Sequence, residues 1–284
     1  MFAVLSIIWG SSFILMKIGL NNGLTAYQVA SIRISSSGLV FLPIALRAIK
    51  SIPSEKLLLV FLSGALGNLI PAFLFCIAEE RIDSSLAGTL NSLTPIFVII
   101  TGIIFFKAKT PVNKIVGICI AFAGTVLLLL SKGNMEETQP LRYVLLVVLA
   151  TIMYGFNVNM VVKKLTGIPA LQLSAVALTL NAIPALIILY VTGFFHQPFT
   201  AKPLLGATGA AVLLGVIGTA AATIIFYSLV KRASALFASM VTYGIPFVAI
   251  AWGIYYNEHI NVKQLLSLLV ILLGVFLANR KRQA

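Results

Sequence analysis

The chain has 284 residues, of which 60% are hydrophobic and only 10% charged, and its mean hydropathy is +1.07. Soluble domains carry about 25% charged residues, so this composition excludes a soluble domain and indicates an integral membrane protein. The net charge of +13 would favour nucleic acid as a partner of a soluble chain. Here the basic residues form short clusters between apolar runs, which is typical of cytoplasmic loops. We therefore expect the lipid bilayer as a partner, and no nucleic acid.

The chain begins with an apolar stretch, Met1 to Trp9, that lacks a basic leader and a small-residue cleavage site. We interpret it as the start of a first span and not as a signal peptide, and expect a few cytoplasmic residues to be missing before Met1.

Cys76 and Cys119 both lie within apolar runs, where thiols behave as small hydrophobic groups. We expect no disulfide, no metal site and no cofactor.

Apolar runs long enough to cross a bilayer, about 20 residues each, recur along the whole chain. We expect helices, because backbone polar groups in hydrocarbon must pair within their own segment and the runs lack the period of two that barrel strands show. The ten predicted spans are 2–20, 25–46, 57–78, 84–106, 113–131, 142–162, 169–191, 204–229, 234–256 and 262–278.

An internal repeat relates the two halves of the chain. Shifted by 151 positions, the stretch from Phe75 to Lys107 matches the second half in a frame of helix end, charged turn, and apolar run with a central proline. The matching residues are Phe75, Arg81, Ala87, Pro95, Ile99, Gly102 and Ile103 with Phe226, Arg232, Ala238, Pro246, Ile250, Gly253 and Ile254.

Basic residues set the predicted orientation. With both termini cytoplasmic, thirteen Lys and Arg fall inside and five outside, and the charged stretch Glu79 to Asp83 becomes an outer turn. Five spans per half is an odd number, so the second half enters the membrane inverted. The fold class we predict is an all-α membrane protein of two inverted five-helix repeats, 1–132 and 141–284, with a site between them.

Two charges fall within predicted spans, where charges are costly and usually face a cavity. Lys17 either lines a cavity or extends to the interface. Arg33 lies about 12 Å into its span. It either caps backbone carbonyls, pairs with a carboxylate at the outer end of the third span, or meets an anionic group of a substrate.

Polar and aromatic residues recur at related positions of the spans, such as Trp9 with Tyr154 and Asn91 with Thr242. A single such residue can simply bond a neighbouring helix, but the recurrence favours a shared cavity. The predicted substrate-binding residues are Trp9, Ser12, Phe13, Lys17, Arg33, Asn68, Asn91, Tyr154, Asn157, Tyr227 and Tyr243. Proline removes a helical hydrogen bond and permits bending, so the predicted gating or kink positions are Pro71, Pro95, Pro246, Gly102 and Gly253.

An enzyme is not expected, because the spans contain no Asp pair, no HExxH motif and no phosphate-binding glycine loop, and both His196 and His259 fall in predicted outer loops. The uniformly apolar spans 113–131 and 262–278 are expected to form a back wall or the face of a homodimer.

The order of these motifs resembles the EamA family of the drug/metabolite transporter superfamily. The resemblance rests on Trp9-Gly10-Ser11-Ser12-Phe13 with Lys17, on Ala30-Ser31-Ile32-Arg33, on the proline-centred fourth and ninth spans, and on Pro246, Trp252-Gly253 and Glu258. It covers the whole chain and implies secondary transport of small metabolites, often the export of amino acids. The chain departs from the family in two ways: Lys107 stands where a second glutamate is common, and the basic leader is absent.

We therefore predict a permease of the inner or plasma membrane that exports small metabolites by alternating access. The alternatives are transport of another solute class (a sugar, a nucleoside or a cationic drug) and a membrane scaffold without transport. With Lys17 and Arg33 as the only charges expected within the membrane, a carboxylate-bearing or zwitterionic solute fits better than a cation.

Overall fold

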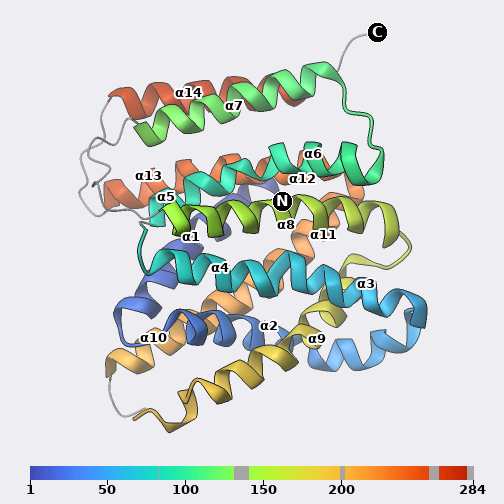
Figure 1. Cartoon of the computed structure of the whole chain (residues 1–284), viewed down its shortest axis with the longest axis vertical. Helices are drawn as coiled ribbons and strands as arrows, with labels where there is room; N and C mark the ends of the chain where they lie inside the picture. Colours follow the sequence, from blue (N-terminus) through green and yellow to red (C-terminus); the bar gives the residue numbers. More distant parts are fainter. Residues whose placement is uncertain (83, 131–140, 199–201, 256–261, 280–284) are drawn as a thin grey trace.

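The computed structural model describes residues 1–82, 84–130, 141–198, 202–255 and 262–279, and within these ranges the chain is helical and contains no β-strand. The helices stack roughly side by side along the long axis of the molecule (Figure 1). Their bounds are α1 (Phe2–Asn21), α2 (Ala26–Ala48), α3 (Ser54–Gly64), α4 (Ile70–Glu79), α5 (Ser84–Leu90), α6 (Thr94–Phe106), α7 (Val112–Leu130), α8 (Leu141–Lys164), α9 (Ala170–Val191), α10 (Lys202–Leu213), α11 (Ala222–Arg232), α12 (Ala235–Ser239), α13 (Ile245–Tyr255) and α14 (Val262–Asn279).

Seven helical segments of the described chain are long and apolar enough to cross a membrane: Phe2–Asn21, Ala26–Ser51, Ser54–Glu79, Leu86–Phe106, Leu141–Lys164, Ala170–Val191 and Lys202–Arg232. The remaining three predicted spans contain shorter apolar helices, Val112–Leu128, Ala235–Val248 and Leu265–Ala278. The chain is therefore a multi-pass helical membrane protein.

Local sequence explains where several helices begin. The Thr25 side chain accepts the backbone N–H of Gln28, while the Gln28 side chain accepts that of Thr25, and this reciprocal cap starts α2. Pro71, Pro95 and Pro246 lie in the first turn of α4, α6 and α13. Backbone N–H groups in a first turn have no acceptor within the helix, so proline removes no hydrogen bond there.

Irregular turns interrupt corresponding spans of the two halves. A π-helical stretch, Ala65–Leu69, joins α3 to α4, and another, Leu214–Ala221, joins α10 to α11. A 3₁₀ stretch, Asn91–Leu93, precedes α6, and Met240–Gly244 precedes α13. Such departures within helices often mark functional sites or hinges, and here they recur with the period of the sequence repeat.

Helix packing interlocks the halves reciprocally. The first helix, α1, packs against α10 and α13, while its counterpart α8 packs against α4 and α6. The two largest helix contacts join equivalent helices directly, α2 with α9 and α7 with α14. The centre of the molecule is therefore built from both halves (Figure 1).

The α7–α14 pair lies at one end of the long axis (Figure 1). Its glycines permit close backbone approach: a Cβ added at Gly274 would lie 2.6 Å from the Gly117 carbonyl oxygen, and one at Gly124 would lie 2.7 Å from the Ile271 nitrogen. By contrast, a Cβ added at Gly206 or Gly209 would meet nothing within 4 Å.

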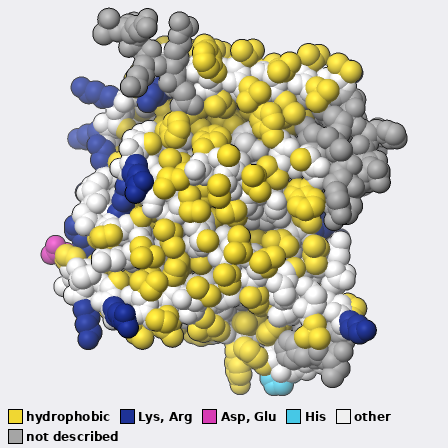
Figure 2. Space-filling model, turned by 180° about the vertical axis from the view of Figure 1, so that it is seen from behind, with side chains coloured by type: hydrophobic (Ala, Val, Ile, Leu, Met, Phe, Trp, Pro, Cys, Tyr) yellow, Lys and Arg dark blue, Asp and Glu magenta, His cyan; other side chains and the backbone are white. Residues whose placement is uncertain are grey.

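Charge is distributed unevenly over the outside. Figure 2 shows lysine and arginine side chains gathered along one edge of the molecule, beside a broad apolar band. Exposed basic residues end or follow α2, α6, α8 and α11, namely Arg47, Lys50, Lys107, Lys109, Lys163, Lys164 and Arg232.

Candidate functional site

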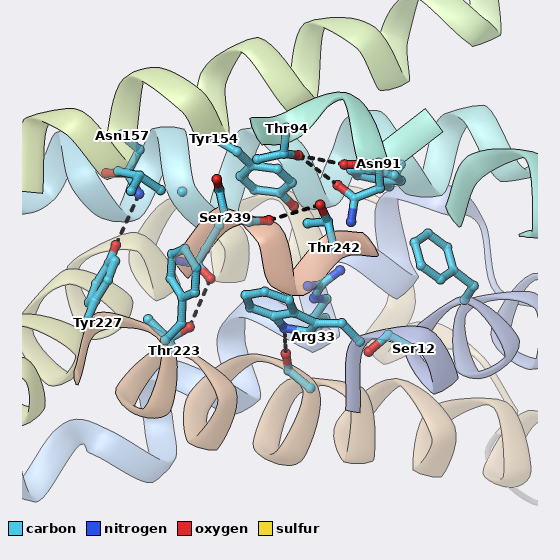
Figure 3. Close-up of a pocket in the computed structure, with 18 of the residues that line it drawn as sticks. Ser12, Arg33, Asn91, Thr94, Tyr154, Asn157, Thr223, Tyr227, Ser239 and Thr242 are labelled. Atoms are coloured by element: carbon cyan, nitrogen blue, oxygen red, sulfur yellow. Dashed lines mark hydrogen bonds between the residues drawn. The ribbon is translucent and has the colours of Figure 1, made fainter. Parts of the chain in front are cut away.

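A cavity lies at the centre of the molecule, between helices of both halves. The cavity encloses about 780 Å³ of space free of protein atoms, and this figure includes the part that opens to the surroundings. It is lined by Trp9, Ser12, Phe13, Met16, Arg33, Gly67, Asn68, Phe75, Asn91, Thr94, Tyr154, Asn157, Val158, Gly218, Thr223, Phe226, Tyr227, Ser239 and Thr242. The side chains converge from several helices, with Asn157 and Tyr227 at the end away from Ser12 and Asn91 (Figure 3).

Residues at matching positions of the repeat line this cavity together. Three pairs are separated by the repeat distance of 151 residues and a fourth, from the first helix of each half, by 145. The pairs are Gly67 with Gly218, Phe75 with Phe226, Asn91 with Thr242, and Trp9 with Tyr154. The cavity is therefore pseudo-symmetric in its residues as well as in the helices around it.

Nine of the eleven predicted substrate-binding residues line the cavity; Lys17 and Tyr243 do not. The Lys17 ammonium donates to the backbone carbonyl of Glu79 at 2.8 Å, and the Tyr243 hydroxyl donates to that of Ile118 at 3.2 Å. These two side chains bond neighbouring helix backbones, as intramembrane polar groups often do. Substrate contact by the other nine stays a prediction.

Arg33 brings a positive charge to the cavity wall. Its Nε donates to Thr219 Oγ1 at 2.8 Å, a second guanidinium nitrogen contacts the Met16 sulfur at 3.9 Å, and only 8% of the residue is exposed. Neither partner is a carboxylate, so one of the three alternatives, pairing with an acid at the outer end of the third span, is not formed among the described residues. The guanidinium has five N–H donors, which leaves some of them for a ligand.

Amide and hydroxyl groups form short networks around the cavity (Figure 3). Thr223 donates to Asn68 Oδ1 at 3.2 Å, and Asn157 Nδ2 donates to the Tyr227 hydroxyl at 3.2 Å. The same hydroxyl shares a 2.8 Å hydrogen bond with Ser63. Asn157 Oδ1 is buried and finds no partner among the described residues. Buried acceptors are normally satisfied, so this oxygen is suited to accept a hydrogen bond from a ligand or water.

Aromatic rings supply the apolar part of the wall. The Trp9 ring lies 5.2 Å from that of Phe226, and its indole N–H donates to the Gly218 carbonyl at 3.1 Å. Phe75 contacts Phe13 edge-to-face at 5.8 Å and stacks with Tyr154 at 6.2 Å. Sites for small organic molecules typically combine aromatic side chains with a few polar groups that orient the ligand.

The three predicted gating prolines lie where helices change form. Pro71 follows a π-helical stretch, and Pro95 and Pro246 follow 3₁₀ stretches. Gly102 faces Asn159, whose amide donates to Val98 and Thr101 and so joins α8 to α6. Gly253 lies in α13, and Glu258 lies outside the described residues. Movement at these positions stays a prediction.

Sequence reasoning assigned no site role to Met16, Gly67, Phe75, Thr94, Val158, Gly218, Thr223, Phe226 and Ser239, and it named Thr242 only as the counterpart of Asn91. The repeat carries the signal that identifies some of them, because Gly67 with Gly218 and Phe75 with Phe226 are identities at the repeat distance. Met16 and Val158 carry no comparable signal.

A multi-pass helical protein with a central cavity of polar and aromatic side chains has the architecture of a membrane transporter. The chain belongs to the EamA-like transporter family, whose model matches residues 1–130 and 141–280. The family resemblance stated from the sequence is thereby confirmed.

Relatives of similar length carry transporter names. The chain is 27% identical over 278 residues to an "uncharacterized transporter" of Archaeoglobus fulgidus, covering 96% of this chain and 95% of that protein. It is 25% identical over 251 residues to the "uncharacterized inner membrane transporter YedA" of Escherichia coli K12, covering 88% and 79%. A solved crystal structure, 15% identical, matches with a TM-score of 0.72 over 98% of this chain and 95% of the other, and shows the shared fold.

Proposed function

We propose that the protein is a secondary-active permease that exports small metabolites, amino acids or related compounds, by alternating access. The observation that carries this proposal is the cavity whose wall combines matched positions of both halves, such as Phe75 with Phe226 and Asn91 with Thr242. A site between related halves can be exposed to one side of the membrane and then to the other.

The proposed architecture has ten spans in two inverted five-helix halves, 1–132 and 141–284. The recurrent irregular turns and the reciprocal packing of α1 and α8 support the repeat. The basic edge in Figure 2 supports a cytoplasmic location for the ends of α2, α6, α8 and α11, and hence for both termini. The name of the Escherichia coli relative supports the inner or plasma membrane as the location.

The proposed movement is bending at Pro71, Pro95 and Pro246, and at Gly102 and Gly253. In each proline-containing segment an irregular stretch sits beside the first turn of a regular helix. Fewer backbone hydrogen bonds resist bending at such a junction.

A second copy of the chain is a further proposed partner, at the apolar face of α7 and α14.

The proposed solute carries a carboxylate together with hydrogen-bond donors. Arg33 offers positive charge on one wall, and Asn157 Oδ1 offers an unused acceptor on another. Aromatic rings between them suit an apolar or aliphatic portion of the solute. Transport of a sugar, nucleoside or cationic drug is the second candidate, and the charge of Arg33 disfavours the last of these.

A scaffold without transport is disfavoured by the polar wall of the cavity. That function predicts a dry, apolar centre in which Asn and Tyr side chains are used up in helix contacts. Several polar side chains instead border about 780 Å³ of space, and Asn157 Oδ1 is unpartnered within the described chain.

A thermal-shift screen of the purified protein against amino acids, sugars, nucleosides and lipophilic cations tests the proposal. A ligand present at 100 times its Kd stabilises the folded state by about 2.7 kcal/mol, so a bound solute raises the unfolding temperature measurably. We expect stabilisation by carboxylate-bearing metabolites. Greater stabilisation by a lipophilic cation than by any amino acid would reject the proposed solute class, and no stabilisation by any class would reject the permease.

A further inference from the structure

Glu79 is a completely buried acid at the C-terminal end of α4. Its exposure is 0%, whereas Glu80 and Glu55 are exposed, and these are the three acids whose exposure the structure describes. It ends one of the membrane-crossing segments, Ser54–Glu79. The sequence predicts Glu79 in a charged turn that follows a span. In the structure Glu79 is the last residue of α4, and neighbouring helices bury its side chain.

The two carboxyl oxygens of Glu79 have different surroundings. Oε2 accepts a hydrogen bond from the Ser84 hydroxyl at 3.0 Å. Oε1 is buried and has no hydrogen-bond partner among the described residues. The Lys17 ammonium donates to the backbone carbonyl of Glu79 at 2.8 Å, and so bonds the main chain of this residue.

Other ionisable groups around Glu79 also have partners elsewhere. Arg33 of α2 is close enough to interact electrostatically with Glu79, but it bonds Thr219 and Met16. Cys76, one turn earlier in α4, contacts the Met16 sulfur. Glu80 caps the neighbouring helix α2 by accepting the Ala26 N–H at 3.1 Å, and Tyr154 faces the cavity.

This environment suits a neutral carboxylic acid better than a carboxylate. An ionised carboxylate would leave a charge-bearing oxygen buried without a donor, which costs much more than leaving a neutral carbonyl oxygen there. The neutral acid keeps its hydrogen bond with Ser84, as donor or acceptor. An acid buried in this way, next to charged groups of a transport cavity, is a functional candidate by default.

Glu79 also lies next to the cavity wall. Phe75, one turn earlier in α4, contacts Phe13 at the wall, and the Ser84 hydroxyl that bonds Glu79 also approaches the Phe13 carbonyl at 3.5 Å. A movement that separates Phe13 from Phe75 would therefore open the surroundings of Glu79 and of the cavity together.

We propose that Glu79 is a proton-binding site that couples transport to the proton gradient. Opening of this end admits water, the O–H bond of the carboxyl breaks, and the proton passes to a water molecule; on closing, a hydronium ion returns a proton to the carboxylate and the acid is buried again. The coupling rests on the proposed permease function, whereas proton binding by Glu79 does not.

Infrared spectroscopy of the full-length protein in lipid vesicles, recorded during a pH titration, tests the site without any solute. Exposed carboxyls ionise near pH 4, so a carbonyl absorption of a protonated carboxyl at pH 7 reports a buried acid. We expect this absorption in the wild type and its complete loss in Glu79→Gln. Glu80→Gln is the matched control, since it neutralises the adjacent exposed acid, and should keep the absorption.

Absence of the absorption from the wild type at pH 7, or its persistence in Glu79→Gln, would overturn the proposal. If Glu79→Gln fails to fold, Glu79→Asp keeps the acid and should shift the absorption; an unshifted absorption would also overturn the proposal. The thermal-shift screen is independent of this readout, so loss of the proton site and loss of the permease function are distinguishable.

Discussion

The side-chain amide of Asn157 in α8 donates a hydrogen bond to the Tyr227 hydroxyl in α11, 3.2 Å away, at one end of the central cavity. Tyr227 also bonds Ser63 of α3 and is only 1% exposed, so one hydroxyl joins three helices. Gly67 makes room for this junction, because a Cβ added there would lie 3.2 Å from the hydroxyl oxygen and closer still to the Asn157 amide. The junction helps to hold this end of the cavity together.

Tyr227→Phe should lower stability modestly, because it removes the shared hydroxyl and leaves both partners buried. A hydrogen bond between membrane helices contributes about 0.6 kcal/mol on average and at most about 1.7 kcal/mol, so we expect a loss of about 1–2 kcal/mol. Thermal unfolding in detergent measures it. Tyr190→Phe is the control, since Tyr190 is 67% exposed, and an equal loss there would contradict the role given to the junction.

Trp9→Ala and Asn157→Ala should reduce solute flux without reducing the amount of folded protein. Each removes a side chain from the cavity wall, and truncation of a central binding residue typically costs about 1–2 kcal/mol or more of binding. Flux is measured in vesicles with the solute selected by the thermal-shift screen. Ile7→Ala and Leu149→Ala change exposed residues of the same helices and should transport like wild type. If Trp9→Ala and Asn157→Ala do so too, the site assignment is wrong.

Arg33→Met should weaken binding of carboxylate-bearing solutes selectively. A hydrogen bond to a charged group contributes about 1.5–3 kcal/mol, which corresponds to about 10- to 100-fold in affinity. Arg47→Met removes the same charge from an exposed position in the same helix and should leave affinity unchanged. Equal affinities of the Arg33→Met protein and the wild type, measured by equilibrium binding, would show that Arg33 is structural.

Gly274→Ala should destabilise the α7–α14 contact, because the added Cβ would lie 2.6 Å from the Gly117 carbonyl oxygen. Overpacking of this kind costs about 1–3 kcal/mol. Gly209→Ala, in α10, meets nothing within 4 Å and should be neutral or slightly stabilising. Unfolding measurements that find both variants equally stable would argue against tight packing of this pair.

The sequence was sufficient to predict helices and the approximate limits of the seven long apolar segments. Long apolar runs leave few alternatives in a bilayer, and the turns between them carry charges or helix breakers. It did not reveal that Pro71, Pro95 and Pro246 would each follow an irregular turn, because a proline in the first turn of a new helix and a proline inside a bent helix have the same sequence signature.

Site residues were predictable where polarity or the repeat made them conspicuous within an apolar run. Asn91, Asn157 and Arg33 stand out in this way and line the cavity. Lys17 and Tyr243 are equally conspicuous but bond backbone carbonyls of neighbouring helices. Tertiary packing decides between these outcomes, and it also buries Glu79, which the sequence places beside exposed charges.

Alternating access is tested directly by the accessibility of cysteines placed at Asn91 and Asn157. Cys76 and Cys119 are first replaced by alanine, and each position is then labelled with a membrane-impermeant thiol reagent from either side of the membrane. Alternating access predicts that both positions react from both sides and that a stabilising solute slows the reaction. Reaction from neither side, or from one side only, would contradict a carrier.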